Sequence, residues 1–129
     1  MALAVLDASA LLALLLDEPG AAIVRPLLTD AAMSTVNLGE VVGHYARHGA
    51  PAESIATILT SLPIEYVPFD AVQAHHVGLM LPTTRTAGLS FGDRSCLVLA
   101  RRLALPALTA DQRWTEVAGA VGIEVRVIR

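Results

Sequence analysis

Apolar and polar positions alternate along the chain in blocks that predict short strands followed by helices. Apolar runs of strand length stand at residues 2–6, 31–34, 63–69, 107–109 and 123–128. Segments with apolar residues at helical spacing stand at 8–16, 21–28, 35–46, 54–62, 71–80, 91–104 and 111–121. The last strand alternates charged and apolar residues, as an edge strand does. This order predicts an α/β fold in three α/β/α layers, with a mostly parallel sheet between helices.

Polar residues mark where several of these helices begin. Ser90 has an N-cap side chain and Asp93 stands three residues later, so the pair predicts a capping box. Asn37 is predicted to cap the helix that contains Glu40. Residues 82–88 hold a proline and a glycine and are predicted to form a loop. Two helix starts are therefore placed beside acidic side chains.

Length and composition fit one compact domain. We expect residues 1–129 to form a single domain, because a chain of 129 residues leaves no room for a second module. An apolar fraction of 54% fits a sheet that is buried on both faces, and an oligomer interface would add to it. The uncharged run at 8–16 is too short to span a bilayer and has no basic leader. We therefore expect a cytoplasmic protein without a membrane association, and the single cysteine, Cys96, fits a reducing compartment.

The charge pattern narrows the possible functions. A net charge of -3 argues against broad electrostatic capture of nucleic acid. All nine basic residues are arginine, and the absence of lysine excludes the P-loop NTPases. Four of the arginines lie in or beside the segment 88–114, namely Arg94, Arg101, Arg102 and Arg113. They are either local phosphate ligands or part of a solvated helix face.

Four acidic residues stand at or near the starts of predicted helices: Asp7, Glu40, Asp93 and Asp111. Each could be only a helix cap or a capping-box acid, which stabilises a helix by about 1 kcal/mol. Three of the four follow strands of one predicted parallel sheet, and Asp93 begins the helix that leads to the strand before Asp111. The carboxyl ends of parallel strands share one edge, so we expect the four carboxylates to converge there.

Converging carboxylates predict a bound cation. Two carboxylates about 4 Å apart repel by roughly 4 kcal/mol at an effective dielectric constant near 20, which exceeds what helix capping returns. Oxygen ligands without a histidine or thiolate favour Mg²⁺ or Mn²⁺ over zinc. Such an ion activates water and neutralises phosphate oxygens in phosphodiester hydrolysis. Ser9 and Thr109, each two residues from an acid, could orient a carboxylate through their hydroxyl groups, or could simply fill a turn and a strand.

Four segments together resemble the acidic motifs of a known family. They are Val5-Leu6-Asp7-Ala8-Ser9-Ala10, Asn37-Leu38-Gly39-Glu40-Val41, Gly88-Leu89-Ser90-Phe91-Gly92-Asp93 and Leu108-Thr109-Ala110-Asp111. In order and spacing they are similar to the motifs of PIN-domain nucleases, above all the VapC toxins of toxin-antitoxin modules. The resemblance covers essentially the whole chain and keeps every motif.

The resemblance implies a function and a set of partners. It implies an endoribonuclease that depends on Mg²⁺ or Mn²⁺, forms a homodimer and is inhibited by a cognate antitoxin. It matches Asp7, Glu40, Asp93 and Asp111 to the family's acids and implies that they bind the metal, with Asp7 and Asp93 as the first ligands and Glu40 and Asp111 more variable in role. It matches Ser9 and Thr109 to the hydroxyl neighbours of the family's acids.

Three other interpretations of the sequence compete with the endoribonuclease hypothesis. A phosphoaspartyl fold also sets acids at strand ends, but it normally needs a lysine, which this chain does not have. A PIN-like module kept only for protein pairing is the second, and such a module should have lost at least one of the acids. A nuclease that acts on DNA is the third, and it stays open because no residue reports on the 2′-hydroxyl group of RNA.

Overall fold

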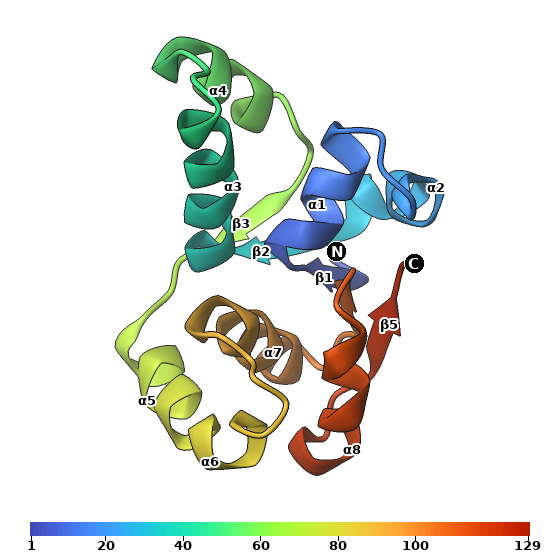
Figure 1. The fold of residues 1–129 in the computed structure, drawn as a ribbon, viewed down its shortest axis with the longest axis vertical. Coiled ribbons are helices and arrows are strands. Elements are labelled where there is room, and N and C mark those ends of the chain that lie inside the picture. Colours follow the sequence, from blue (N-terminus) through green and yellow to red (C-terminus); the bar gives the residue numbers. More distant parts are fainter.

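The computed structural model describes all residues from Met1 to Arg129, and it contains a five-stranded parallel sheet between two layers of helices (Figure 1). The strands are β1 (Ala4–Leu6), β2 (Ala31–Ser34), β3 (Glu65–Val67), β4 (Ala107–Thr109) and β5 (Val125–Val127). Their order across the sheet is β3-β2-β1-β4-β5, and every neighbouring pair is parallel. The predicted α/β fold is confirmed, and β5 lies at an edge as its alternating polarity indicated.

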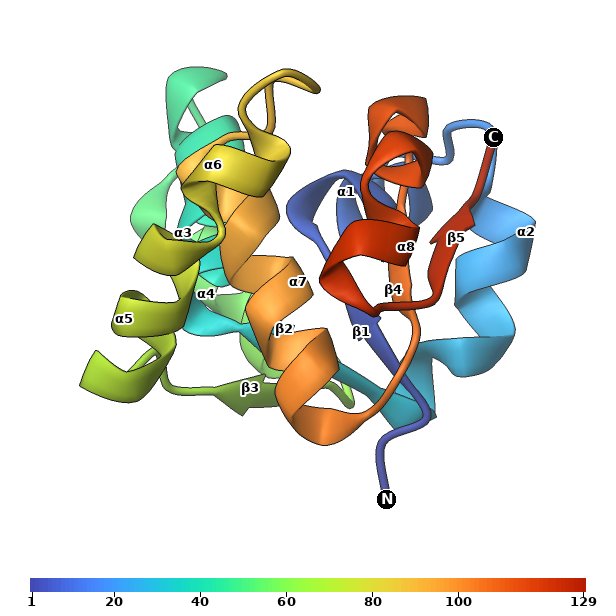
Figure 2. The ribbon, with the colours of Figure 1, turned by 90° about the horizontal axis from the view of Figure 1, so that it is seen from below.

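The strands are buried on both faces because their side chains alternate between two apolar cores. Val5 packs into one core, while its neighbours Ala4 and Leu6 pack into the other. The first core lies under α5 (Ala71–Leu79), α7 (Phe91–Leu103) and α8 (Ala118–Val121). The second lies under α1 (Ala8–Leu15), α2 (Ala21–Val24), α3 (Thr35–Arg47) and α4 (Ala52–Thr60). Figure 1 shows the second group above the strands and the first group below them, and in Figure 2, seen from below, α5, α7 and α8 lie toward the viewer.

Three expectations about local structure were wrong in detail. The helix predicted at 111–121 divides into a 3-10 helix, η2 (Gln112–Glu116), in which Trp114 is fully buried, and the short α8. The segment predicted as a loop at 82–88 begins with a short helix, α6 (Leu81–Thr84). The helix predicted at 21–28 ends at Val24 and continues as a 3-10 helix, η1 (Arg25–Asp30), with Pro26 in its first turn.

The connections between elements bring the predicted acids to one edge of the sheet. The carboxyl ends of β1, β2 and β4 all point the same way, since these strands are parallel neighbours. Helix α7 returns toward the start of β4, so its first turn lies at the same edge. None of the helices combines the length and the apolar character that a membrane span requires.

Candidate active site at the carboxyl edge of the sheet

Asp7 lies at the junction between β1 and α1, and the local sequence explains why. The apolar strand ends at Leu6, and Asp7 keeps an extended backbone conformation while the helix begins at Ala8. Its Oδ1 atom accepts a hydrogen bond of 2.8 Å from the backbone N–H of Ala10, as an N-cap carboxylate does. The side chain is only 5% exposed, because it sits at the carboxyl end of the central strand of the sheet.

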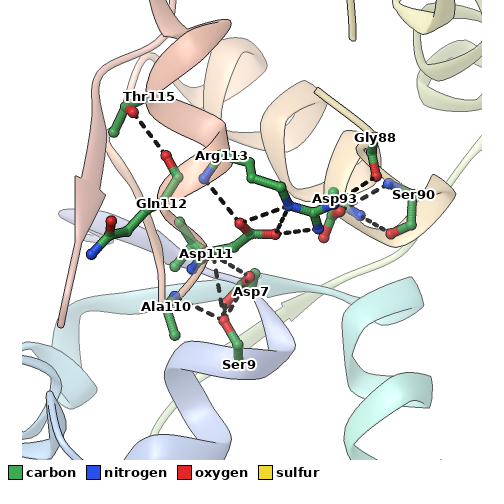
Figure 3. Close-up of polar contacts among 11 residues, drawn as sticks. Asp7, Ser9, Gly88, Ser90, Asp93, Ala110, Asp111, Gln112, Arg113 and Thr115 are labelled. Atoms are coloured by element: carbon green, nitrogen blue, oxygen red, sulfur yellow. Dashed lines mark hydrogen bonds and ion pairs between the residues drawn. The ribbon is translucent and has the colours of Figure 1, made fainter. Parts of the chain in front are cut away.

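Two hydroxyl groups also donate to the Asp7 carboxylate, and Figure 3 shows the one from Ser9. Ser9 Oγ donates to Asp7 Oδ1 at 2.7 Å, and Thr109 Oγ1 donates to Asp7 Oδ2 at 2.7 Å. Each hydroxyl oxygen also accepts a backbone N–H, from Ala110 at 2.9 Å and from Asp111 at 3.1 Å respectively. The two side chains predicted to orient a carboxylate therefore contact Asp7, and they tie it to the end of β4.

The surroundings of Asp7 change the pKa of its carboxyl group. Burial raises the pKa of the Asp7 carboxyl from 3.8 to about 6, and the negative charge of Asp93 adds to this rise. The hydrogen bonds from Thr109, Ser9 and Ala10 oppose it, because they favour the ionised form. Even with three donors, an isolated carboxylate is costly here, and a nearby cation would relieve that cost.

Glu40 comes from the second turn of α3 and is held by Asn37. The prediction that Asn37 caps this helix was wrong, because Ser34 is the N-cap and its hydroxyl accepts the N–H of Val36. Asn37 lies inside the helix, 1% exposed, and its Nδ2 donates to Glu40 Oε1 at 2.7 Å and to the Gly92 carbonyl at 3.0 Å. The amide thus fixes one oxygen of Glu40 and links α3 to the first turn of α7. A spacing of three residues on one helix face is the signal that could have revealed this pair.

Asp93 forms the predicted capping box with Ser90. Its Oδ2 accepts the backbone N–H of Ser90 at 2.8 Å, and its own N–H donates to Ser90 Oγ at 3.2 Å. The neighbouring Gly92 lies against the Glu40 carboxylate, where an added Cβ atom would come within 2.6 Å of the carboxyl carbon. Only glycine lets the first turn of α7 approach Glu40 this closely, a role that the pattern of the sequence did not reveal.

Three of the predicted acids face one cavity. Asp7, Glu40 and Asp93 line it, and its volume is about 580 Å³. Ser9 lines it beside Asp7, and α3 extends the wall beyond Glu40. The acids therefore converge from three separate elements, the end of β1, the middle of α3 and the start of α7.

Asp111 is not among the residues that line this cavity, and Figure 3 shows it paired with Arg113. Arg113 Nη2 contacts Asp111 Oδ2 at 2.6 Å, and Arg113 Nε reaches Oδ1 at 3.0 Å. Hydrogen bonding to this guanidinium holds the pKa of the Asp111 carboxyl below its ordinary value. To take part in a metal site, the Asp111 carboxylate would have to exchange Arg113 for the ion.

The residues present fit a hard divalent cation by their chemistry. No three acidic, histidine or cysteine side chains come close enough in this structure to enclose an ion by themselves. The cavity nevertheless offers carboxylate oxygens without a thiolate, and Asp93 Oδ1 and Glu40 Oε2 accept no hydrogen bond from the protein. The buried Oδ1 of Asn37 also has no partner. Free oxygen atoms beside a buried carboxylate are the donors that Mg²⁺ or Mn²⁺ takes.

The fold and the site together define a class of protein. It is a three-layer α/β/α domain whose parallel sheet carries carboxylates around a cavity at its carboxyl edge. Residues 4–120 match the family model of the PIN domain, so the chain belongs to the PIN-domain family, whose members are nucleases. No curated protein matches the chain in sequence.

Solved structures of toxin-antitoxin complexes share this fold. A chain of the DNA-bound VapBC complex of Salmonella typhimurium has a TM-score of 0.76 at 16% identity, with 100% of each chain covered. A toxin-antitoxin complex of Klebsiella pneumoniae gives 0.73 at 16% identity, with 98% of each chain covered. VapBC-5 of Mycobacterium tuberculosis gives 0.68 at 22% identity and covers 98% of this chain and 99% of its own. The expected VapC-like fold is confirmed.

Proposed function

We propose that this protein is an endoribonuclease that depends on Mg²⁺ or Mn²⁺ and acts as the toxin of a toxin-antitoxin pair. The observation that carries the proposal is the shared cavity of Asp7, Glu40 and Asp93. Helix capping alone does not require three elements to bring carboxylates to one cavity, where the charge of Asp93 already disfavours the ionised form of Asp7. Because the chain belongs to a family of nucleases, the reaction that we propose for these acids is phosphodiester hydrolysis.

Each of the three acids is positioned before any substrate arrives. Ser9 and Thr109 orient Asp7. Asn37 orients Glu40, and the capping box orients Asp93. Preorganised carboxylates reduce the reorganisation needed for catalysis. When bound, a divalent ion supplies charge neutralisation for the phosphate and lowers the pKa of water.

The proposed metal ligands differ in their position relative to the cavity. Asp7, Glu40 and Asp93 face the cavity and are proposed to hold the ion. Asp111 is proposed as a further ligand only if the Arg113 guanidinium releases it. Ser9 and Thr109 are proposed to act through Asp7, because their hydroxyl protons point to its carboxylate.

The proposed partners follow from the similar structures. The chains of similar fold belong to complexes of a toxin with its antitoxin. We therefore propose that a cognate antitoxin restrains this protein. From the resemblance of its acidic motifs to those of VapC toxins, we propose that it forms a homodimer and acts on RNA in the cytoplasm. A DNA-directed nuclease and a protein-pairing module without catalysis are the alternatives that an experiment must separate.

The test is a cleavage assay with purified protein and labelled RNA in Mg²⁺, Mn²⁺ or EDTA. Asp93→Asn keeps an oxygen that can accept the Ser90 N–H, so it should fold normally and lose cleavage. Asp70→Asn is the matched control, because Asp70 also accepts a backbone N–H at the start of a helix, as the N-cap of α5, but lies outside the cavity. Cleavage that needs the metal, persists in Asp70→Asn and disappears in Asp93→Asn supports the proposal.

The same assay separates the alternatives. DNA of the same sequence is run in parallel, and cleavage of DNA alone would favour a DNA-directed enzyme. Absence of cleavage on both polymers, with a folded protein, would favour the pairing module. Induced expression in a bacterial host adds a test of the toxin role, since growth should stop with the wild type and continue with Asp93→Asn.

A further inference from the structure

The wall of the acidic cavity continues along α3 as a strip of different chemistry. Beyond Glu40, the residues of α3 that line the cavity are Gly43, His44 and Arg47. Residues three, four and seven positions apart share one face of a helix. At a rise of about 1.5 Å per residue, Arg47 lies roughly 10 Å further along the axis than Glu40. One cavity therefore has an acidic end and a basic end.

The middle of this strip is open to the helix backbone. A Cβ atom added at Gly43 would meet no atom within 4 Å, so packing does not require glycine there. Glycine inside a helix costs about 0.5–1 kcal/mol relative to alanine. The absence of a side chain at Gly43 instead leaves space for a ligand, because the cavity reaches the backbone of α3 between Glu40 and Arg47.

The basic end carries side chains that are free to bind a ligand. Arg47 is exposed and makes no ion pair or hydrogen bond within the protein. The His44 ring lies 4.5 Å from the His48 ring at an interplanar angle of 36°, and its nitrogens make no hydrogen bond within the protein. Four other arginines are paired with acids, namely Arg102, Arg113, Arg126 and Arg129. An unpaired guanidinium in the same cavity as a carboxylate cluster fits a second phosphate group.

We propose that Gly43, His44 and Arg47 form a subsite for the nucleotide next to the bond that is cleaved. The inference rests on the proposed nuclease function. Arg47 binds the phosphate of that nucleotide, His44 donates a ring N–H to the same backbone, and Gly43 lets the backbone pass close to α3. On a chain with a net charge of -3, such a local contact would direct the polymer to the acids.

The test is RNA binding measured by fluorescence anisotropy. The probe is a fluorescein-labelled single-stranded oligoribonucleotide of mixed sequence, with Ca²⁺ in place of Mg²⁺ and a gel to verify that it stays intact. Arg47→Gln should weaken binding about fivefold at roughly 0.1 M salt and lower the salt slope by about 0.7, the loss expected for one phosphate contact on a single strand. Arg25→Gln is the matched control, because Arg25 is exposed, unpaired and outside the cavity.

A second pair of variants tests the open backbone without changing charge. Gly43→Leu should fill the middle of the cavity and weaken binding at least as much as Arg47→Gln. Gly39→Leu places the same side chain in the same helix, also where a Cβ meets no atom, but outside the cavity, and should bind like the wild type. In the cleavage assay, Arg47→Gln should raise KM and leave kcat unchanged, because Arg47 lies away from the acids.

The results separate this inference from the proposed function. If metal-dependent cleavage persists and Arg47→Gln and Gly43→Leu bind as tightly as their controls, the subsite is wrong and the nuclease stands. If the wild type neither binds nor cleaves RNA, the proposed function fails and the subsite fails with it. Weakened binding in both variants with unchanged controls supports the subsite.

Discussion

The buried carboxylate of Asp7 should make the stability of the metal-free protein depend on pH. Burial raises its pKa from 3.8 to about 6 in the folded state. A raised pKa means that the folded state binds the proton more tightly than the unfolded state. The contribution to stability is therefore complete below about pH 4 and is lost as the pH rises through about 6. A shift of about 2 units corresponds to about 3 kcal/mol, at about 1.4 kcal/mol per unit.

Asp7→Asn removes this titration and keeps an oxygen for the helix cap. Its amide group faces the Ser9 and Thr109 hydroxyls, which costs stability by an amount that does not vary with pH. The free energy of unfolding of the variant relative to the wild type should therefore rise by about 2–3 kcal/mol from about pH 4 to about pH 8. At about pH 8 the variant gains because it buries no charge.

The assay is urea unfolding in EDTA, followed by circular dichroism over that pH range, for both proteins. Asp70→Asn is the control, because hydrogen bonds lower the pKa of the exposed Asp70 carboxyl instead of raising it. A stability difference between Asp7→Asn and wild type that stays constant with pH would refute the argument. Added Mn²⁺ should stabilise the wild type at about pH 8 more than it stabilises Asp7→Asn.

Three further outcomes follow from single contacts. Asp111→Asn should reduce cleavage much less than Asp93→Asn, because Asp111 is paired with Arg113 outside the cavity; equal losses would place Asp111 among the metal ligands. Gly92→Ala should abolish cleavage and lower the melting temperature, since its Cβ displaces the Glu40 carboxylate, and unchanged activity would contradict this packing. Trp114→Ala should cost about 3–5 kcal/mol in urea unfolding while Trp114→Phe costs less, because the buried indole N–H has no partner to lose.

Local features of the sequence were sufficient for much of the fold. Short apolar runs gave the positions of the strands, and the Ser90 and Asp93 pair gave the start of α7, because strand burial and capping depend on residues only a few positions apart. Acids that follow parallel strands could be assigned to one edge, because the carboxyl ends of parallel strands share that edge.

The arrangement of the site depends on contacts between distant parts of the chain. Asn37 reaches Gly92 across 55 residues, and Thr109 reaches Asp7 across 102 residues. Neither contact leaves a periodic signal, since it forms only when α7 and β4 pack beside α3 and β1. Asp111 is not among the residues that line the cavity of the other three acids, and it pairs instead with Arg113, two residues further along the chain. Residue type and local spacing thus identify the chemistry, whereas the geometry that brings donors and charges together arises only when the layers assemble.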